Sequence, residues 1–246
     1  DQVLTLNGNV ELLRWEELSN SRWLFAGRFK DLSQVESAEL QTLVLEAAIA
    51  NCLTGVNNPE QKEKIRYFFL ADLSHYLDSL RRLSVEVQAH PILRPNLLQQ
   101  HTERTNEIVR KGHDLLEEIN HKTLGQKIKQ IFRMTAGHWA FQSEIVSHAY
   151  EKPSGYPGDY WLMEKIYSGE PLSTSGISGL FDLYFFYSPY AVAVKKRSQK
   201  MSEILEEFIK LNPSSNELNI FNIACGSCCE IHELLPPGIL ARHLRP

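Results

Sequence analysis

The chain has 246 residues, which is more than one average domain of about 150 residues and less than two. Its composition, 43% hydrophobic and 23% charged, excludes disordered and collagen-like chains, and its net charge of -4 argues against a protein that wraps nucleic acid or lies on anionic lipid. No apolar run reaches the roughly 18 residues that span a bilayer, so we expect a globular protein with no membrane span and no nucleic-acid polymer as partner.

Extended structure is predicted at the start of the chain. Residues 3–29 are rich in Val, Leu, Phe and Trp, which predicts two or three short strands. Asn7 and Gly8 form a candidate hairpin turn because both tolerate positive φ; alternatively, Gly8 is a mid-strand glycine that another backbone approaches closely. A helix follows from about residue 33 to residue 52, with Asp31 or Ser33 as its cap, and residues 54–60 break it.

The middle of the chain has helical periodicity. Apolar residues alternate spacings of four and three, which predicts one long helix whose stripe packs against neighbouring helices or a second copy of the chain. The stripe consists of Phe69, Leu73, Tyr76, Leu80, Leu83 and Val87. Two prolines within residues 90–96 end this helix, so a second helix over 97–122 should fold back as an antiparallel hairpin. A third helix over 124–150 carries His138 and His148, which we interpret as packing or hydrogen-bonded histidines.

Residues 151–161, EKPSGYPGDYW, interrupt the helical pattern. Two glycines and two prolines fix an irregular but ordered backbone, and Asp159 is well placed to cap a helix over 160–167. A basic helix is expected over 189–211, followed by a buried-type strand over 218–223 that runs into ACGSCCEIHELL. A strand, a small-residue turn and a helix in this order are how mononucleotide-type α/β domains hold a nucleoside cofactor.

Three segments of this region carry a family resemblance: KPSGYPGDYWLMEKIY at 152–167, SPYAVAVKKR at 188–197 and ACGSCCEI at 224–231. Together they resemble a bacterial family of S-adenosylmethionine-dependent methyltransferase-like proteins, known as extracellular-factor or 3-hydroxypalmitic acid methyl ester biosynthesis proteins. The resemblance covers about residues 125–235 and implies a Rossmann-like methyltransferase domain preceded by a helical cap. The glycine turn departs from the usual methyltransferase motif, because Asn222 stands where an acidic residue is common, and Ala224 and Cys228 replace glycines.

The resemblance also implies a set of site residues. Those that would line the cofactor or substrate pocket are Gly155, Tyr156, Gly158, Asp159 and Tyr160, and those beneath the methionine part of S-adenosylmethionine are Ala224, Cys225 and Gly226. The sulfonium of the cofactor is a strong electrophile, and a fatty carboxylate acceptor is ionised at neutral pH. Alignment of the two groups could therefore supply most of the rate. No catalytic residue is assigned. Arg197 or Lys196 is a candidate partner for a carboxylate, the alternative being a solvated basic helix face. Asp159 is equally a candidate helix cap.

The N-terminal segment has a second, shorter resemblance. The segments LNGNVELLRW at 6–15 and LFAGRFKDLSQVESAELQTLV at 24–44 are similar to the second half of a PilZ domain. PilZ domains bind cyclic di-GMP through an arginine motif and an Asp/Asn-x-Ser-x-x-Gly strand that lie upstream of this region. Neither motif occurs before Leu6, so this chain lacks the parts that would bind the nucleotide.

The cysteines bear on metal binding and compartment. Cys225, Cys228 and Cys229 with His232 have ligand-like spacing, but zinc sites of this kind normally need a second pair, and Cys52 is the only other cysteine. We therefore predict no metal site. Four cysteines in a chain of this length do not form a disulfide framework, which favours the reducing cytoplasm.

These patterns predict an α+β, predominantly helical fold: a short β segment and helix over 1–53, a helical hairpin or bundle over 59–150, and over 151–246 the cap helices and the start of a Rossmann-like domain. The predicted function is that of an S-adenosylmethionine-dependent methyltransferase-like protein, with a fatty-acid carboxylate or another small molecule as acceptor. The alternative is a catalytically degenerate regulatory or interaction protein linked to cyclic di-GMP signalling. The helical stripe also makes a homodimer a prediction.

The two ends of the sequence add an expectation of their own. The chain opens at Asp1 with neither a methionine nor a signal region and stops at Pro246, soon after the predicted turn, so we expect a piece of a longer product. The acidic residue that holds the ribose in such domains usually follows the turn by about twenty residues. It would lie at or beyond Pro246, so this chain alone is expected to bind the cofactor weakly or not at all.

Overall fold

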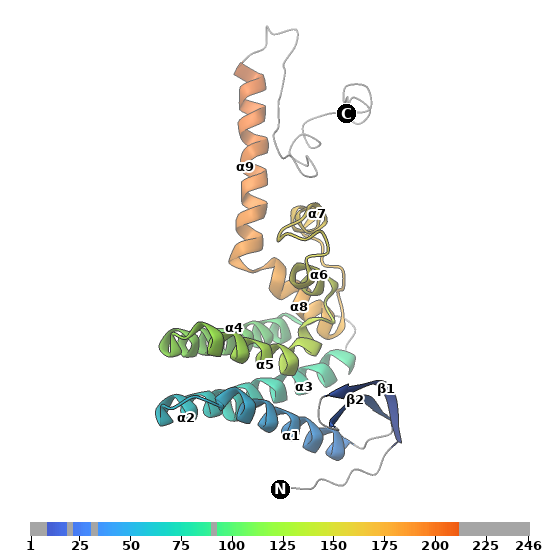
Figure 1. Cartoon of the computed structure of the whole chain (residues 1–246). Helices are drawn as coiled ribbons and strands as arrows, with labels where there is room; N and C mark the ends of the chain where they lie inside the picture. Colours follow the sequence, from blue (N-terminus) through green and yellow to red (C-terminus); the bar gives the residue numbers. More distant parts are fainter. Residues whose placement is uncertain (1–8, 19–21, 31–33, 90–92, 212–246) are drawn as a thin grey trace.

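The computed structural model describes residues 9–18, 22–30, 34–89 and 93–211, with side chains over 41–88 and 93–211. Two strands, β1 (Asn9–Leu18) and β2 (Arg22–Lys30), precede the helices. The helical elements are α1 (Gln34–Leu53), α2 (Pro59–Tyr67), the π-helical turn η1 (Phe68–Leu73), α3 (Ser74–Ala89), α4 (Pro95–Ile119), α5 (Lys122–Ala140), α6 (Glu144–Glu151), α7 (Tyr160–Ser168), α8 (Gly176–Phe186) and α9 (Pro189–Leu211). The prediction of a predominantly helical chain is confirmed (Figure 1).

The two strands form an antiparallel pair. Their register runs from Asn9 opposite Lys30 to Leu18 opposite Arg22, with a shift between Leu12 and Arg14 that marks a bulge. The candidate turn at Asn7 and Gly8 lies outside the described residues, as do the predicted strand over 218–223 and the sequence that follows it. The PilZ-like and Rossmann-like units therefore stay predictions.

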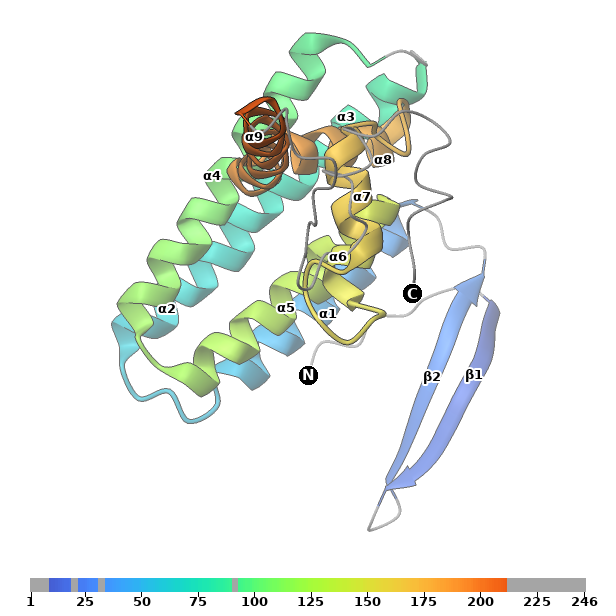
Figure 2. The same cartoon turned by 90° about the horizontal axis from the view of Figure 1, so that it is seen from above.

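The helices of the bundle lie in two layers. In Figures 1 and 2, α4 and α5 form one layer that covers α2, α3 and α1 in the other. All six residues of the predicted stripe are buried within this single chain, because η1 packs against α4 and α3 packs against α4 and α8. Packing within the chain, one of the two interpretations of the stripe, is thus confirmed, and the stripe does not supply a surface for a homodimer. Among the described residues, no helix has the length and apolar character needed to cross a membrane.

The long helix that carries the stripe contains a wider turn than the sequence predicts. It continues from α2 through η1 into α3, and Ser74 Oγ donates to the carbonyl of Phe69, five residues earlier, at 3.3 Å. The helix begins at Pro59, just inside the predicted break at 54–60: the Asn58 side chain accepts from the amides of Glu60 and Gln61, and Pro59 occupies the first turn.

The predicted third helix over 124–150 is wrong as a single helix. It is divided into α5 and α6 at residues 141–143, so His138 and His148 lie on different helices. Ser143 begins α6 by accepting from the amide of Val146 at 3.1 Å, and its hydroxyl donates to Asp182 on α8 at 2.6 Å. Both Ser143 and Asp182 are fully buried, so a contact from 39 residues away in the sequence fixes the break.

The break separates two hydrophobic cores. The larger core joins α1 to α5 with α8. The smaller core brings α6, α7 and α9 together through Ile145, Leu162, Ile166, Ala191 and Val194. The loop between α6 and α7 is therefore attached at both ends to one packed unit, beside the base of the projecting α9 (Figure 1).

His101 on α4 lies in the larger core, and neither of its ring nitrogens has a hydrogen-bond partner among the described residues. It is fully buried, and the rings of Phe181 and Tyr184 on α8 meet it edge-on, with centroid distances of 4.5 Å and 5.7 Å. Burial without a compensating partner disfavours the charged imidazolium. It lowers the pKa of His101 from 6.5 to about 4.

This lowered pKa makes stability depend on pH. Stability from the neutral ring is fully present above the unfolded value of 6.5 and is lost as pH falls toward about 4, because only the unfolded chain binds the proton there. As pH falls from about 7 to about 5, the free energy of unfolding should decrease by about 2 kcal/mol because of His101. His101→Phe keeps an aromatic ring that cannot titrate, so urea unfolding should show a smaller loss in the variant. Equal losses in the two proteins would show that His101 is not the titrating group.

Candidate functional site

The loop between α6 and α7 has the ordered, irregular backbone that the sequence predicts. Lys152, at the end of α6, has φ 50°, and its amide donates to the carbonyl of His148. Gly155 and Gly158 follow with φ 83° and φ 70°. Only glycine adopts such positive φ values without steric cost, so the two glycines allow the chain to reverse twice within a few residues.

Asp159 is the centre of this loop. Its side chain is 2% exposed and receives hydrogen bonds from three parts of the chain. The amide of Leu162 donates at 3.1 Å, which caps α7 as predicted, and Ser154 Oγ donates from the loop at 2.8 Å. His148 Nε2 on α6 lies 2.9 Å and 2.8 Å from the two carboxylate oxygens. One carboxylate thus ties α6, the loop and α7 together.

The hydrogen bonds keep Asp159 ionised. Burial by itself would raise the pKa of the carboxyl, but the hydrogen bonds from Leu162, Ser154 and His148 outweigh it and hold the pKa below its ordinary value of 3.8. Because an ionised carboxylate only accepts, His148 carries a proton on Nε2. The loop therefore covers a fixed negative charge.

Aromatic and cationic side chains extend from this pair toward the surface. The His148 ring stacks on Trp161 with a centroid distance of 4.1 Å, and Lys165 Nζ lies 5.6 Å from the Trp161 ring centroid. The interpretation of His148 as a packing or hydrogen-bonded residue is confirmed, and its position links the buried Asp159 to the first turn of α7.

The outer face of the loop is formed by tyrosines. Tyr156 and Tyr160 are 52% and 57% exposed, and Tyr190 at the start of α9 is 54% exposed. Tyr190 also limits the space beside the loop, because a Cβ added to Gly158 would lie 3.4 Å from its hydroxyl oxygen, whereas a Cβ on Gly155 would meet open space. The exposed rings leave π faces and hydroxyl groups available to a ligand.

The other predicted site residues do not join this loop within the described part of the chain. Arg197 is exposed on α9, and no hydrogen bond or ion pair connects it to residues 152–160. Lys196 lines a separate 250 Å³ pocket between α8 and α9, near Gly169 and Tyr187. Three predicted cofactor residues, Ala224, Cys225 and Gly226, lie outside the described residues, as do the other candidate metal ligands, Cys228, Cys229 and His232.

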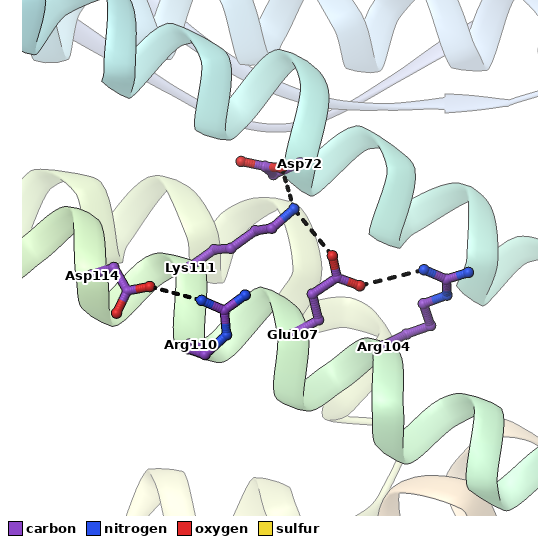
Figure 3. Close-up of polar contacts among 6 residues, drawn as sticks. All are labelled: Asp72, Arg104, Glu107, Arg110, Lys111 and Asp114. Atoms are coloured by element: carbon purple, nitrogen blue, oxygen red, sulfur yellow. Dashed lines mark hydrogen bonds and ion pairs between the residues drawn. The ribbon is translucent and has the colours of Figure 1, made fainter.

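A second polar cluster lies between α4 and η1 (Figure 3). Lys111 Nζ bridges Asp72 at 2.6 Å and Glu107 at 3.1 Å, and Glu107 also accepts from Arg104 at 3.3 Å. The hydrogen bonds to Asp72 and Glu107 raise the pKa of Lys111, and the hydrogen bond from Lys111 lowers the pKa of Glu107. The adjoining cavity is only 200 Å³, and its two cations and two carboxylates pair with one another. The cluster therefore joins α4 to η1 without leaving a charge for a ligand.

Comparison of the chain with protein-family models, with curated proteins and with solved structures finds no match.

The three hydrogen bonds make Asp159 a residue whose substitution should be costly. Asp159→Asn keeps the shape but removes the charge, and we expect it to lower the free energy of unfolding by about 2 kcal/mol at neutral pH. Since the folded pKa lies below 3.8, the carboxylate's contribution is present above that value and is lost as pH falls through the lowered one. The difference in the free energy of unfolding between the native protein and the variant, measured in urea, should therefore become smaller below pH 3.8.

Asp78→Asn is the matched control, because this carboxylate is 60% exposed and, among the residues that the structure describes, pairs with Arg81 alone. It should change the free energy of unfolding by less than about 1 kcal/mol. A stability of Asp159→Asn equal to that of the native protein at neutral pH would show that Asp159 does not hold the loop.

Proposed function

We propose that this chain is an S-adenosylmethionine-dependent methyltransferase-like protein in which the loop over 154–160 contributes to the cofactor surface. The observation that carries the proposal is the buried, ionised Asp159 beneath a face of exposed tyrosines. S-adenosylmethionine is a sulfonium cation attached to a purine nucleoside. Aromatic faces attract such cations and also stack on planar bases, and a fixed negative charge nearby adds to the attraction.

The second support is the preformed backbone of the loop. Gly155 and Gly158 already have the positive φ values that let a ligand approach the main chain, and Asp159 fixes them through Ser154 and Leu162. A site held before the ligand arrives loses less conformational entropy on binding. Methyl transfer from a sulfonium to an ionised carboxylate depends mainly on alignment, so a rigid loop suits this chemistry.

The helix that leads out of the described region also suits the proposal. Among residues 189–211, the distal half of α9 exposes Met201, Ile204 and Leu211 at 49%, 50% and 72%. An apolar helix face directly before the predicted strand over 218–223 is the kind of surface that packs on a sheet in α/β domains.

The acceptor proposed from the sequence is a fatty-acid carboxylate, and the compartment proposed from the cysteines is the cytoplasm.

Isothermal titration calorimetry of the intact protein, as its gene encodes it, with S-adenosylmethionine tests this function. The double variant Tyr156→Ala/Tyr160→Ala should weaken binding by about tenfold, because it removes two aromatic faces without disturbing a buried contact. Tyr67→Ala is the matched control: Tyr67 is 63% exposed on α2 and should leave the affinity unchanged.

Two outcomes would contradict the proposal. A folded intact protein that does not bind S-adenosylmethionine would favour the alternative, a catalytically degenerate regulatory or interaction protein linked to cyclic di-GMP signalling. Equal affinities of the native protein and the double tyrosine variant would remove the loop from the cofactor site.

A further inference from the structure

An apolar groove of 340 Å³ lies between α4 and α5, apart from the loop and from the ion-pair cluster. Its floor and walls include Phe68, Ile108, Leu116, Ile128, Phe132 and Val109. Phe68, Ile108 and Ile128 are buried core residues. Val109 is 41% exposed. An apolar wall that is open to water in this way offers contact area to a ligand.

The groove exists because the two helices diverge and because α4 carries a glycine there. Figure 2 shows α4 and α5 separating from the short connection between Ile119 and Lys122. Gly112 faces the floor of the groove, since a Cβ added to it would lie 3.5 Å from the ring of Phe68. A side chain at position 112 would therefore occupy part of the space that the glycine leaves empty.

Two cations lie along the groove. They are Lys129 and Arg133, which lie one turn apart on α5. Arg133 donates from Nε to the carbonyl of Lys129 at 3.0 Å and from Nη1 to the Tyr150 hydroxyl at 3.1 Å, with the Tyr150 ring 5.7 Å away. Neither Lys129 nor Arg133 forms an ion pair with a carboxylate in the part of the chain that the structure describes.

The cations on α4 are arranged differently from Lys129 and Arg133 on α5. Arg104, Arg110 and Lys111 each pair with a carboxylate at 3.3 Å or less (Figure 3). The groove therefore combines an apolar interior with positive charge at one edge and no lining carboxylate, which is complementary to a molecule with an apolar chain and an anionic end.

We propose that the groove binds a single-chain amphiphile, with its hydrocarbon chain over Phe68 and Phe132 and its anionic headgroup against Arg133 and Lys129. The volume is in the range of small-molecule sites, which start at about 300 Å³. A docked protein helix would need a longer apolar surface, but on α4 the apolar lining extends only from Ile108 to Leu116. This occupant belongs to the same chemical class as the acceptor proposed above, but binding in the groove requires no cofactor and is tested separately from methyl transfer.

The position of Arg133 places the headgroup near the candidate functional site. Tyr150, which receives the hydrogen bond from Arg133, is in the last turn of α6, and the loop over 152–159 begins directly after that helix. An anionic group held by Arg133 therefore lies on the same side of α5 as the end of α6, from which the glycine loop departs.

Isothermal titration calorimetry with dodecanoate, below its micelle concentration, tests the groove in the full chain. Dodecanoate should bind, and dodecyltrimethylammonium, which has the same chain and the opposite charge, should bind more weakly. Lys129→Gln/Arg133→Gln should weaken dodecanoate binding by about tenfold and leave the binding of uncharged dodecanol unchanged. Arg110→Gln, which removes a 65% exposed cation elsewhere on α4, is the matched control and should have no effect. Gly112→Leu should weaken both dodecanoate and dodecanol, because it fills the groove itself.

Several results would overturn the proposal: no binding of dodecanoate, equal binding of the cationic amphiphile, or the same affinity in the native protein and both groove variants. Binding of an acidic amphipathic helical peptide without binding of dodecanoate would instead make the groove a protein-docking surface. A protein that binds dodecanoate but not S-adenosylmethionine would retain the groove and lose the proposed cofactor site, so the two proposals fail separately.

Discussion

The geometry of the candidate site depends on a single buried carboxylate. Asp159 is almost fully removed from water, and an ionised carboxylate in that position would be strongly destabilising without donors around it. The amide of Leu162, the hydroxyl of Ser154 and the imidazole of His148 supply those donors from α7, the loop and α6. Because the three donors come from separate segments, satisfying one charge fixes the orientation of all three, and the two glycines between them take up the required backbone turns.

The same solution occurs again at the junction of the two cores. Asp182 on α8 is fully buried and accepts from the hydroxyl of Ser143 at 2.6 Å and from the amide of Ser173 at 2.8 Å. It thereby holds the start of α6 against α8, as Asp159 holds the end of α6 against α7. The glycine loop and the groove edge at Arg133 are both connected to α6, so these two aspartates determine how the candidate sites are placed on the bundle.

Local signals explain which features could be predicted from the sequence. The bounds of α9, the cap at Asp159 and the burial of the stripe from Phe69 to Val87 follow from periodicity, proline and capping residues within a few positions. Long-range contacts decide the features that were missed. The break before Ser143 depends on Asp182, the donation of His148 to Asp159 depends on how α6 returns to the loop, and the groove depends on the angle between α4 and α5. The exposed pair Lys129 and Arg133 is visible in the sequence as an i,i+4 spacing, but the absence of acidic partners for it among the described residues is a property of the fold alone.

Hydrogen–deuterium exchange of the intact protein, with and without S-adenosylmethionine, tests most directly whether the loop held by Asp159 is the cofactor surface. The account predicts that added cofactor slows exchange of the amides over 154–162, while the amides over 108–116 in α4, which line the groove and not the loop, keep their rates. Slower exchange elsewhere, with the loop amides unchanged while the cofactor is bound, would contradict it.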